Sequence, residues 1–443
     1  MSEPSPALNL VSIPTGTAAR PSGARFSGTR RDGPYWLGCV VFALVLAAVT
    51  TLSAHRVWGL CAAAGYATAA VLAGRSSAAW GRGAALAAAA GSVVVPLAVL
   101  MVLGTAQPEV GVVEHSARLL LNTGSPYAPH PVDVGDFNPY LPGMAVFGLP
   151  HALLGDTPLA DARLWFAAVF LGSMALAARY AGDGGHAPAS PPAAPRTAGS
   201  LPPARAALLL AGFPAVALPV AVGGVDLPVI GLMCLALALA GRRGSGTAAG
   251  AALGAAAALK WTAWPLLPVA LVLLLVTAGR RTALRAAATA LLVAAVAVVP
   301  SALADPHAFV EHVVLFPLGA AGTGSPATSP LPGYLLATYV PGGHVLAVAA
   351  LAVSALAVGT WLLVRPPRTV LAAADRLALG LGLAMCLMPA TRFGYLVYPL
   401  VLVTWFRQSR TAAPTAARPA LTAAVALPAR RAHTTDAETE RAA

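Results

Sequence analysis

Two isolated cations and one isolated carboxylate lie where the chain is otherwise apolar. Lys260, in AALKWTAWP, is the only lysine of the chain, and Arg392 lies in MPATRFGYLVYP. An ammonium is a point-charge partner for a phosphate, and a guanidinium can bind phosphate or carboxylate through two hydrogen bonds. The alternative for both is a flank residue that reaches the membrane surface. Asp226, in GGVDLP, is costly if buried alone, so it should face water, a cation or a site.

A further candidate lies in the segment 105–127. Apolar residues recur there at helical spacing, which predicts an amphipathic helix on the membrane surface, with Pro108 in its first turn and its end near Gly124. Glu114 precedes Arg118 by four residues, and this order favours a surface ion pair. Glu109 has no such partner within the helix. It is either a first-turn acid favoured by the helix dipole or a functional carboxylate.

Aromatic residues follow that helix in SPY, which ends at Tyr127, and in FNPYLPG, which contains Asn138. Aromatic residues near a membrane interface act as anchors, and in a sugar site they also stack on apolar sugar faces. Tyr395, three residues after Arg392, is a similar candidate. Both interpretations stay open at this point.

Metal and nucleotide motifs are absent from the sequence. His307, Glu311 and His312 have the spacing H-x-x-x-E-H, which matches neither zinc-protease pattern, although His307 and Glu311 should share a helix face. The four cysteines lie inside apolar runs without metal-ligand spacing. We therefore expect no cofactor, assign no metal ligand, find no support for a divalent metal, and expect no nucleotide-driven mechanism.

The composition excludes a soluble enzyme. Of 443 residues, 58% are hydrophobic and 10% are charged, and the mean hydropathy is +0.74, whereas a soluble domain carries roughly 25% charged residues. The formal charge of +12 comes largely from arginines in short gaps between apolar runs. That spacing is typical of membrane flanks and does not indicate a nucleic-acid partner.

The apolar runs predict an all-α fold, a polytopic transmembrane helical bundle of about 12 spans. A span takes about 20 apolar residues. The candidates lie near residues 36–53, 57–74, 83–104, 160–180, 205–222, 225–241, 246–259, 261–278, 283–303, 343–364, 370–388 and 392–407. The first resembles a signal sequence, but further spans follow it at once, so we interpret it as an uncleaved anchor.

The arginines orient these spans. Because Lys and Arg concentrate on the cytoplasmic side, one alternation gathers most arginine clusters there, together with both termini. It leaves outside the loops 105–138 and 304–333 and the turns at Asp226, Lys260 and Arg392. The alternation requires that the proline-rich segment 139–158 does not cross but is re-entrant or interfacial.

Three segments lack apolar periodicity and divide the chain. Residues 1–34 and 408–443 are interpreted as disordered cytoplasmic tails, and 181–204 as a flexible cytoplasmic insert, because they are rich in Pro, Ala, Ser, Thr and Gly. The membrane domain therefore covers residues 35–407.

The run from Glu109 to Tyr127 and on through FNPYLPGMAVFGLPHALLG resembles the first outer loop of glycosyltransferase family 87. The stretch Gly223–Pro268, with a turn, a span and a Gly/Ala-rich helix that ends in Lys260, is similar to the same family. These are membrane enzymes of the GT-C type that depend on polyprenyl-phosphate sugars, and they include bacterial envelope mannosyltransferases. The family usually has Asp where this chain has Glu109.

The resemblance implies transfer of a sugar, with mannose favoured, from a polyprenyl-phosphate donor in the outer leaflet to a hydroxyl of an envelope glycolipid or glycan, with inversion. It implies Glu109 as the base, since a carboxylate can deprotonate the attacking hydroxyl. Lys260 and Arg392 would stabilise the departing lipid phosphate. The expected sugar or acceptor contacts are the following: Tyr127, Asn138, Asp226 and Tyr395.

Two other classes of function fit a polytopic chain. A transporter or lipid flippase also needs many spans and charges, but such proteins usually place ionisable groups at mid-depth, whereas here they cluster in outer loops. A non-catalytic scaffold for envelope assembly would leave Glu109 as a helix-start acid only. Counter-flow of an unchanged lipid in vesicles would favour the first alternative.

Overall fold

The computed structural model describes residues 32–76, 80–182, 209–210, 212–242, 244–321, 323 and 327–411. Most of the two tails predicted to be disordered and almost all of the insert 181–204 lie outside this part, but residues 32–34 belong to the first helix and 408–411 to the last, so the predicted tails reach too far into the helical region at both ends. The described residues form helices joined by turns, and their only β pairing is one bridge between Thr328 and Thr391. The predicted all-α class is confirmed for this part of the chain.

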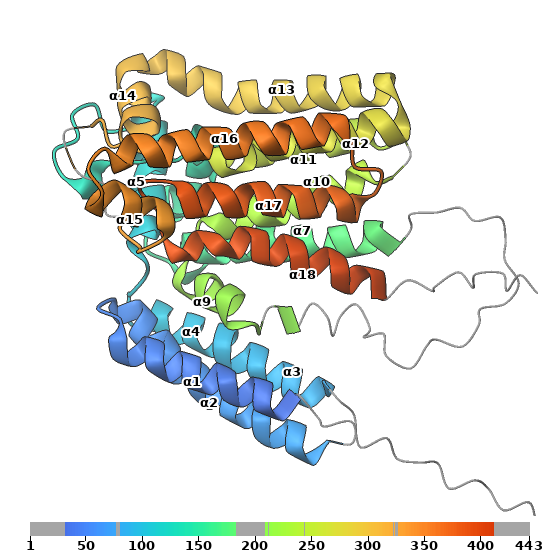
Figure 1. The fold of residues 1–443 in the computed structure, drawn as a ribbon. Coiled ribbons are helices and arrows are strands. Elements are labelled where there is room, and N and C mark those ends of the chain that lie inside the picture. The colour runs from blue at the N-terminus through green and yellow to red at the C-terminus, as the bar shows by residue number, and fades with distance from the viewer. Residues whose placement is uncertain are drawn as a thin grey trace, which may run out of the picture.

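The first four helices form a separate unit (Figure 1). A π-helical turn joins the last two into one continuous helix over Arg82–Val102. Trp36, Trp58 and Tyr66 are fully buried in a core that belongs to this unit and reaches the rest of the molecule through α9. The helices are the following: α1 (Asp32–Val49), α2 (Ser53–Arg75), α3 (Arg82–Ala89) and α4 (Val95–Val102).

Most of the other helices lie side by side in one bundle, and the nine-residue α9 lies between this bundle and the first unit (Figure 1). Nearly every residue of α10 is buried, as expected for a helix that is hydrophobic on all sides. The helices are the following: α7 (Ala162–Gly182), α9 (Pro214–Val222), α10 (Asp226–Ala240), α11 (Gly246–Leu259), α12 (Leu266–Ala278), α13 (Arg280–Ala304), α16 (Gly343–Val364), α17 (Val370–Leu387) and α18 (Val397–Thr411).

Small residues determine how α11 packs on α13. Gly246, Gly250 and Gly254 recur every four residues and therefore lie on one helix face. A Cβ atom at each would clash with backbone atoms of α13, so the glycines permit a close approach of the two helices. This packing fixes the end of α11, where Lys260 follows.

Short helices gather at one end of the bundle (Figure 1). Among them, α5 begins at Pro108 and ends before Gly124 in the left-handed conformation, as the sequence predicts. A 3-10 helix over Pro142–Gly148 continues into α6, and the pair is too short to span about 30 Å of hydrocarbon. The elements are α5 (Pro108–Thr123), α6 (Leu149–Leu154), α14 (Pro306–Val310) and α15 (Pro332–Tyr339).

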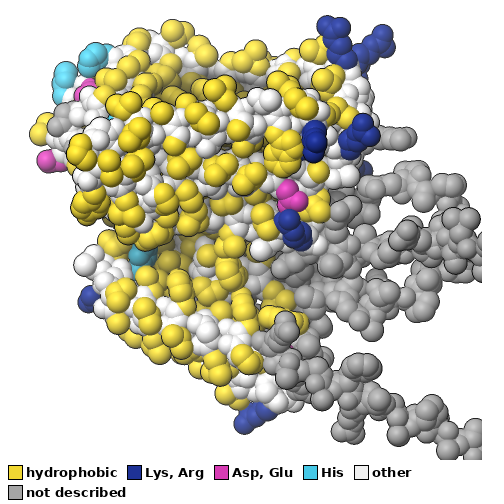
Figure 2. Space-filling model, in the orientation of Figure 1, with side chains coloured by type: hydrophobic (Ala, Val, Ile, Leu, Met, Phe, Trp, Pro, Cys, Tyr) yellow, Lys and Arg dark blue, Asp and Glu magenta, His cyan; other side chains and the backbone are white. Residues whose placement is uncertain are grey.

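Eight helices of the described residues are long and apolar enough to cross a membrane. They correspond to eight of the expected twelve spans. Three of the other expected spans contain shorter helices, and the fourth, 205–222, begins with residues 205–208, which lie outside the described part, so the predicted number of twelve is not confirmed. Helix α1 begins and α18 ends at the same end of the bundle, opposite the short helices (Figure 1). Most Lys and Arg side chains on the visible face also gather at that end, away from most His side chains (Figure 2).

Candidate active site

The end of the bundle where the short helices gather contains an ion pair between Glu109 and Arg392, which are 283 residues apart in the chain. Glu109 is in the first turn of α5, where the helix dipole favours an acid. Arg392 precedes the 3-10 turn that leads into α18. The guanidinium donates to Oε1 of Glu109, whereas Oε2 is buried and has no hydrogen-bond partner among the described residues. One carboxylate oxygen is therefore held and the other is free to accept a proton.

A second ion pair joins Lys260 and Asp226, at the end of α11 and the start of α10. The Lys260 Nζ to Asp226 Oδ1 distance is 2.5 Å. The Tyr398 hydroxyl donates to the same Oδ1 at 2.7 Å, and its oxygen is 2.7 Å from the Thr262 hydroxyl. Only 11% of the Lys260 side chain and 17% of the Asp226 side chain are exposed, so Asp226 has the cation that burial demands.

Two tyrosine rings flank the Lys260 ammonium. Its Nζ atom is 5.3 Å from the ring centroid of Tyr140 and 5.0 Å from that of Tyr395, within the range of cation–π attraction. Burial alone would lower the pKa of Lys260, but the Asp226 carboxylate raises it above its usual value. Burial alone would likewise lower the pKa of Arg392, and Glu109 raises it. Both groups are therefore cations at neutral pH.

Two cavities meet at this site. The cavity that reaches Phe137 and Thr328, which we call the loop-side cavity, has a volume of about 920 Å³. The cavity that reaches Phe42 and Leu400, which we call the lateral cavity, has a volume of about 590 Å³. Glu109, Tyr140 and Arg392 line both of them, whereas Lys260 and Asp226 line only the lateral cavity. A group held between the cavities could be approached from the loop side by one reactant and from the lateral side by another.

The walls of the two cavities differ in chemistry. The loop-side cavity has aromatic and hydroxyl-bearing walls, which include Phe137, Phe316, Phe393, Thr328 and Ser329. Most of the lateral cavity is apolar, with walls from α1, α9 and α18, and Asp226 and Lys260 line it as well. Figure 2 shows the hollow between the α1–α4 unit and the rest of the molecule, where α1, α9 and α18 meet.

Tyr127 and Asn138 are not among the residues that line either cavity. The Tyr127 hydroxyl donates to the Tyr140 carbonyl oxygen at 2.9 Å. The Asn138 side chain accepts from the Tyr140 backbone N–H at 3.1 Å and donates to the Ser116 hydroxyl at 2.9 Å. Both therefore position Tyr140, and their predicted contact with a sugar stays a prediction.

His312 belongs to the same loop framework. The Asn138 N–H donates to its Nδ1 atom at 2.9 Å, so Nε2 carries the proton and donates to the Ala128 carbonyl oxygen at 2.9 Å. Burial lowers the pKa of His312. His307 and Glu311 share a helix face as predicted, 3.8 Å apart, and the described residues contain no cluster suited to a metal ion.

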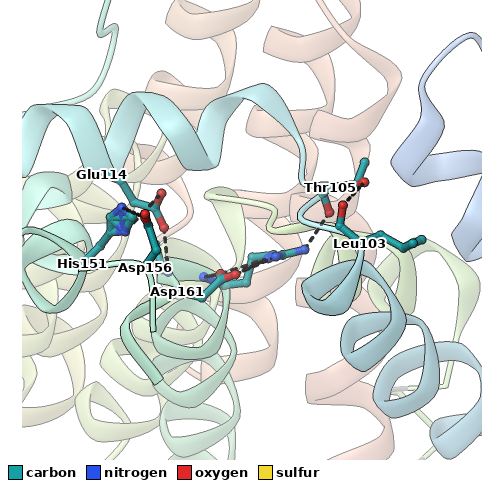
Figure 3. A network of polar contacts seen from close by, with 8 residues as sticks. Leu103, Thr105, Glu114, His151, Asp156 and Asp161 are labelled. Carbon is teal, nitrogen blue, oxygen red and sulfur yellow. Dashed lines mark hydrogen bonds and ion pairs between the residues drawn. The ribbon is translucent and has the colours of Figure 1, made fainter. Parts of the chain in front are cut away.

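Glu114 does not form the predicted pair with Arg118. Arg118 is exposed, whereas Glu114 is turned towards the start of α7 (Figure 3). Its Oε1 accepts from the Ala162 N–H at 3.2 Å, and its Oε2 is 3.8 Å from Nδ1 of His151. His151 is also 3.2 Å from Asp156. Tertiary packing rather than helix spacing selects the partner of Glu114, and the contacts fix α5 against the rest of the bundle.

Reasoning from the sequence missed several residues of the site. Tyr140 lies within the FNPYLPG motif, which gives it the same aromatic signal as its neighbours. Tyr398 follows Tyr395 by three residues, a spacing that places both on one helix face. Thr262 and His55 had no signal of their own. His55, from α2, lines both cavities.

Residues 138–390, more than half of the chain, match the model of Glycosyltransferase family 87. The matched segment contains Asn138, Asp226 and Lys260, begins after Glu109 and ends just before Arg392. No curated protein and no solved structure gives a significant match. The chain therefore belongs to glycosyltransferase family 87 and is a membrane protein with glycosyltransferase activity.

Proposed function

We propose that this protein transfers a sugar, mannose in the first instance, from a polyprenyl-phosphate donor to a hydroxyl of a cell-envelope glycolipid or glycan, with inversion. The observation that carries the proposal is the position of Glu109. Glu109 lines both the loop-side and the lateral cavity, and its buried Oε2 atom has no hydrogen-bond partner among the described residues. A general base has to lie within hydrogen-bond reach of the attacking hydroxyl, to the side of the path from its oxygen to the anomeric carbon.

The lateral cavity supports a lipid-linked phosphate donor. An apolar wall suits a hydrocarbon chain, and the Lys260 ammonium, which lines the same cavity, suits a phosphate. Arg392 lines the same cavity and can bind phosphate oxygens in a planar, two-point manner. A donor that arrives through the membrane needs no nucleotide pocket, in agreement with the absence of nucleotide motifs in the sequence.

The loop-side cavity supports a carbohydrate acceptor. Its aromatic rings offer flat apolar surfaces for sugar faces, and Thr328 and Ser329 offer hydroxyl groups. Phe137 and Phe316 are stacked on each other, with ring centroids 4.4 Å apart, so this wall is held in a defined shape. The acceptor hydroxyl would reach Oε2 of Glu109 from this side.

The proposed reaction is a single displacement. The acceptor oxygen forms a bond to the anomeric carbon, while the bond from that carbon to the phosphate oxygen breaks and its electron pair stays with the phosphate. The hydroxyl proton passes to Oε2 of Glu109. Lys260 and Arg392 stabilise the additional negative charge on the lipid phosphate. Attack from the side opposite the leaving phosphate inverts the anomeric carbon.

We further propose that the site faces the outside of the cell and that both termini are cytoplasmic. The grouping of most visible Lys and Arg side chains at the end opposite the site supports this orientation, since basic residues concentrate on the cytoplasmic side (Figure 2). The lipid donor would then enter from the outer leaflet.

The test measures transfer from a panel of labelled polyprenyl-phosphate sugars to envelope glycolipids by the purified protein and by Glu109→Gln. Removal of a general base should lower kcat by about 100-fold to 10,000-fold. Glu311→Gln, a neutralised carboxylate that lines neither cavity, is the matched control and should keep the rate. Transfer by Glu109→Gln at the wild-type rate would overturn the role of Glu109. The absence of transfer from every donor would overturn the proposed function.

A further inference from the structure

The hairpin of α1 and α2 precedes the segment that matches the family, which begins at residue 138. Its two helices pack closely on each other and share a core with α3 and α4. Towards the rest of the molecule, that core continues into α9, through Ala217, Ala221 and Val222. The hairpin is therefore held by its own unit and stands opposite α18 across the lateral cavity (Figure 1).

Helix α1 presents two different faces. Cys39, Ala43 and Ala47 are buried in the core of the hairpin unit. Phe42 and Leu46, four residues apart and therefore on one side of the helix, line the lateral cavity instead. Phe42 is 47% exposed in the structure, so its ring is available to a ligand in the cavity.

Other helices add further apolar side chains to the same cavity. Helix α9 contributes Leu218 and α18 contributes Leu400, and Lys260 and Arg392 line the cavity as well. The lateral cavity thus combines apolar walls with cationic side chains. A hydrocarbon chain attached to a phosphate complements this combination, with its apolar part beside α1 when its phosphate is at Lys260.

We propose that the α1–α2 hairpin is a donor-binding element of this enzyme, and that Phe42 and Leu46 contact the first isoprenoid units of the donor, next to the phosphate. This inference rests on the proposed function. It assigns the recognition of the lipid to residues outside the family-matched segment, so the site is incomplete without the hairpin.

The kinetic test compares a donor with a long polyprenyl chain with a donor whose lipid is a single isoprenoid unit. The double variant Phe42→Ala/Leu46→Ala should raise the KM of the long donor about tenfold, because two apolar contacts are truncated. Its kcat should not change, since the chain is bound equally in the ground and transition states. The KM of the short donor should change much less.

The matched control is Leu37→Ala/Leu44→Ala, which removes apolar side chains from the same helix. Leu37 and Leu44 are 56% and 47% exposed, and neither lines the cavities at the site. This variant should keep both KM values. An equal change in KM for the two donors, or an equal effect of the control, would overturn the inference while sugar transfer itself would still stand.

A second readout does not depend on turnover. A long-chain donor analogue with a photoreactive group on its first isoprenoid unit should cross-link to α1, and excess unlabelled long-chain polyprenyl phosphate should prevent the reaction. Cross-links confined to helices other than α1 and α2 would overturn the inference. Displacement by an ordinary anionic phospholipid, to the same degree as by polyprenyl phosphate, would also overturn it.

Discussion

The pair of Lys260 and Asp226 allows a structural role to be separated from a catalytic one. In Lys260→Met the Asp226 carboxylate loses its cation and keeps the Tyr398 hydroxyl. Removal of one partner from a buried pair costs about 3–5 kcal/mol. Because 17% of the Asp226 side chain is exposed and one hydrogen bond remains, we expect the free energy of unfolding to fall by about 3 kcal/mol.

The double variant Lys260→Met/Asp226→Asn removes both charges. Replacement of a buried pair by neutral groups is often close to neutral, so the double variant should regain most of the lost stability, to within about 1 kcal/mol. Thermal unfolding of the purified proteins in detergent measures this recovery. The melting temperature should fall in Lys260→Met and return towards the wild-type value in the double variant.

Activity should not recover with stability. If Lys260 stabilises the departing phosphate, its loss should lower kcat by about 100-fold to 1,000-fold, in the single and the double variant alike. The assay is sugar transfer at saturating donor. A double variant that is both stable and active would contradict the proposed role of Lys260 at the departing phosphate, because Lys260 would then be only the partner of Asp226.

Two further predictions concern the framework of the site. Since the pKa of His312 is lowered in the folded protein, its contribution to stability is complete above its unfolded value of about 6.5 and is lost as the pH falls below that value. The melting temperature should therefore fall between about pH 7 and about pH 5, and His312→Asn should remove that part of the slope; an unchanged slope would contradict the role of His312. Gly250→Ala should lower the melting temperature although Ala favours a helix, because its Cβ would clash with α13. Gly172→Ala, with open space around the added atom, should not lower it, and equal effects would show that the α11–α13 contact is unimportant.

Several features of the fold follow from local sequence. The helices that could cross a membrane follow from long apolar runs, because hydrocarbon requires every backbone hydrogen bond to be made within the helix. The limits of α5 follow from Pro108 and Gly124, since a missing N–H suits a first turn and a glycine suits the left-handed end. The prolines of 139–158 and the parity of the arginines predict that this segment does not cross, and its helix over Pro142–Leu154 is shorter than the eight candidate spans.

The sequence also shows four isolated charges, Glu109, Asp226, Lys260 and Arg392, and these residues form the two ion pairs. The sequence does not show which of the four residues pair with each other. Which side of a helix meets which neighbour depends on packing between elements far apart in the chain, and no pattern within one segment encodes it.

Tertiary structure alone decided the remaining features of the site. It joined Glu109 to Arg392, directed Tyr127 and Asn138 towards Tyr140, and gave Glu114 a partner other than the one four residues away. Local sequence sets the chemistry available and the helices that carry it, because polarity and helix ends act within a few residues. The three-dimensional packing determined which of these groups share a cavity, because contacts over hundreds of residues depend on how helices approach and rotate against one another.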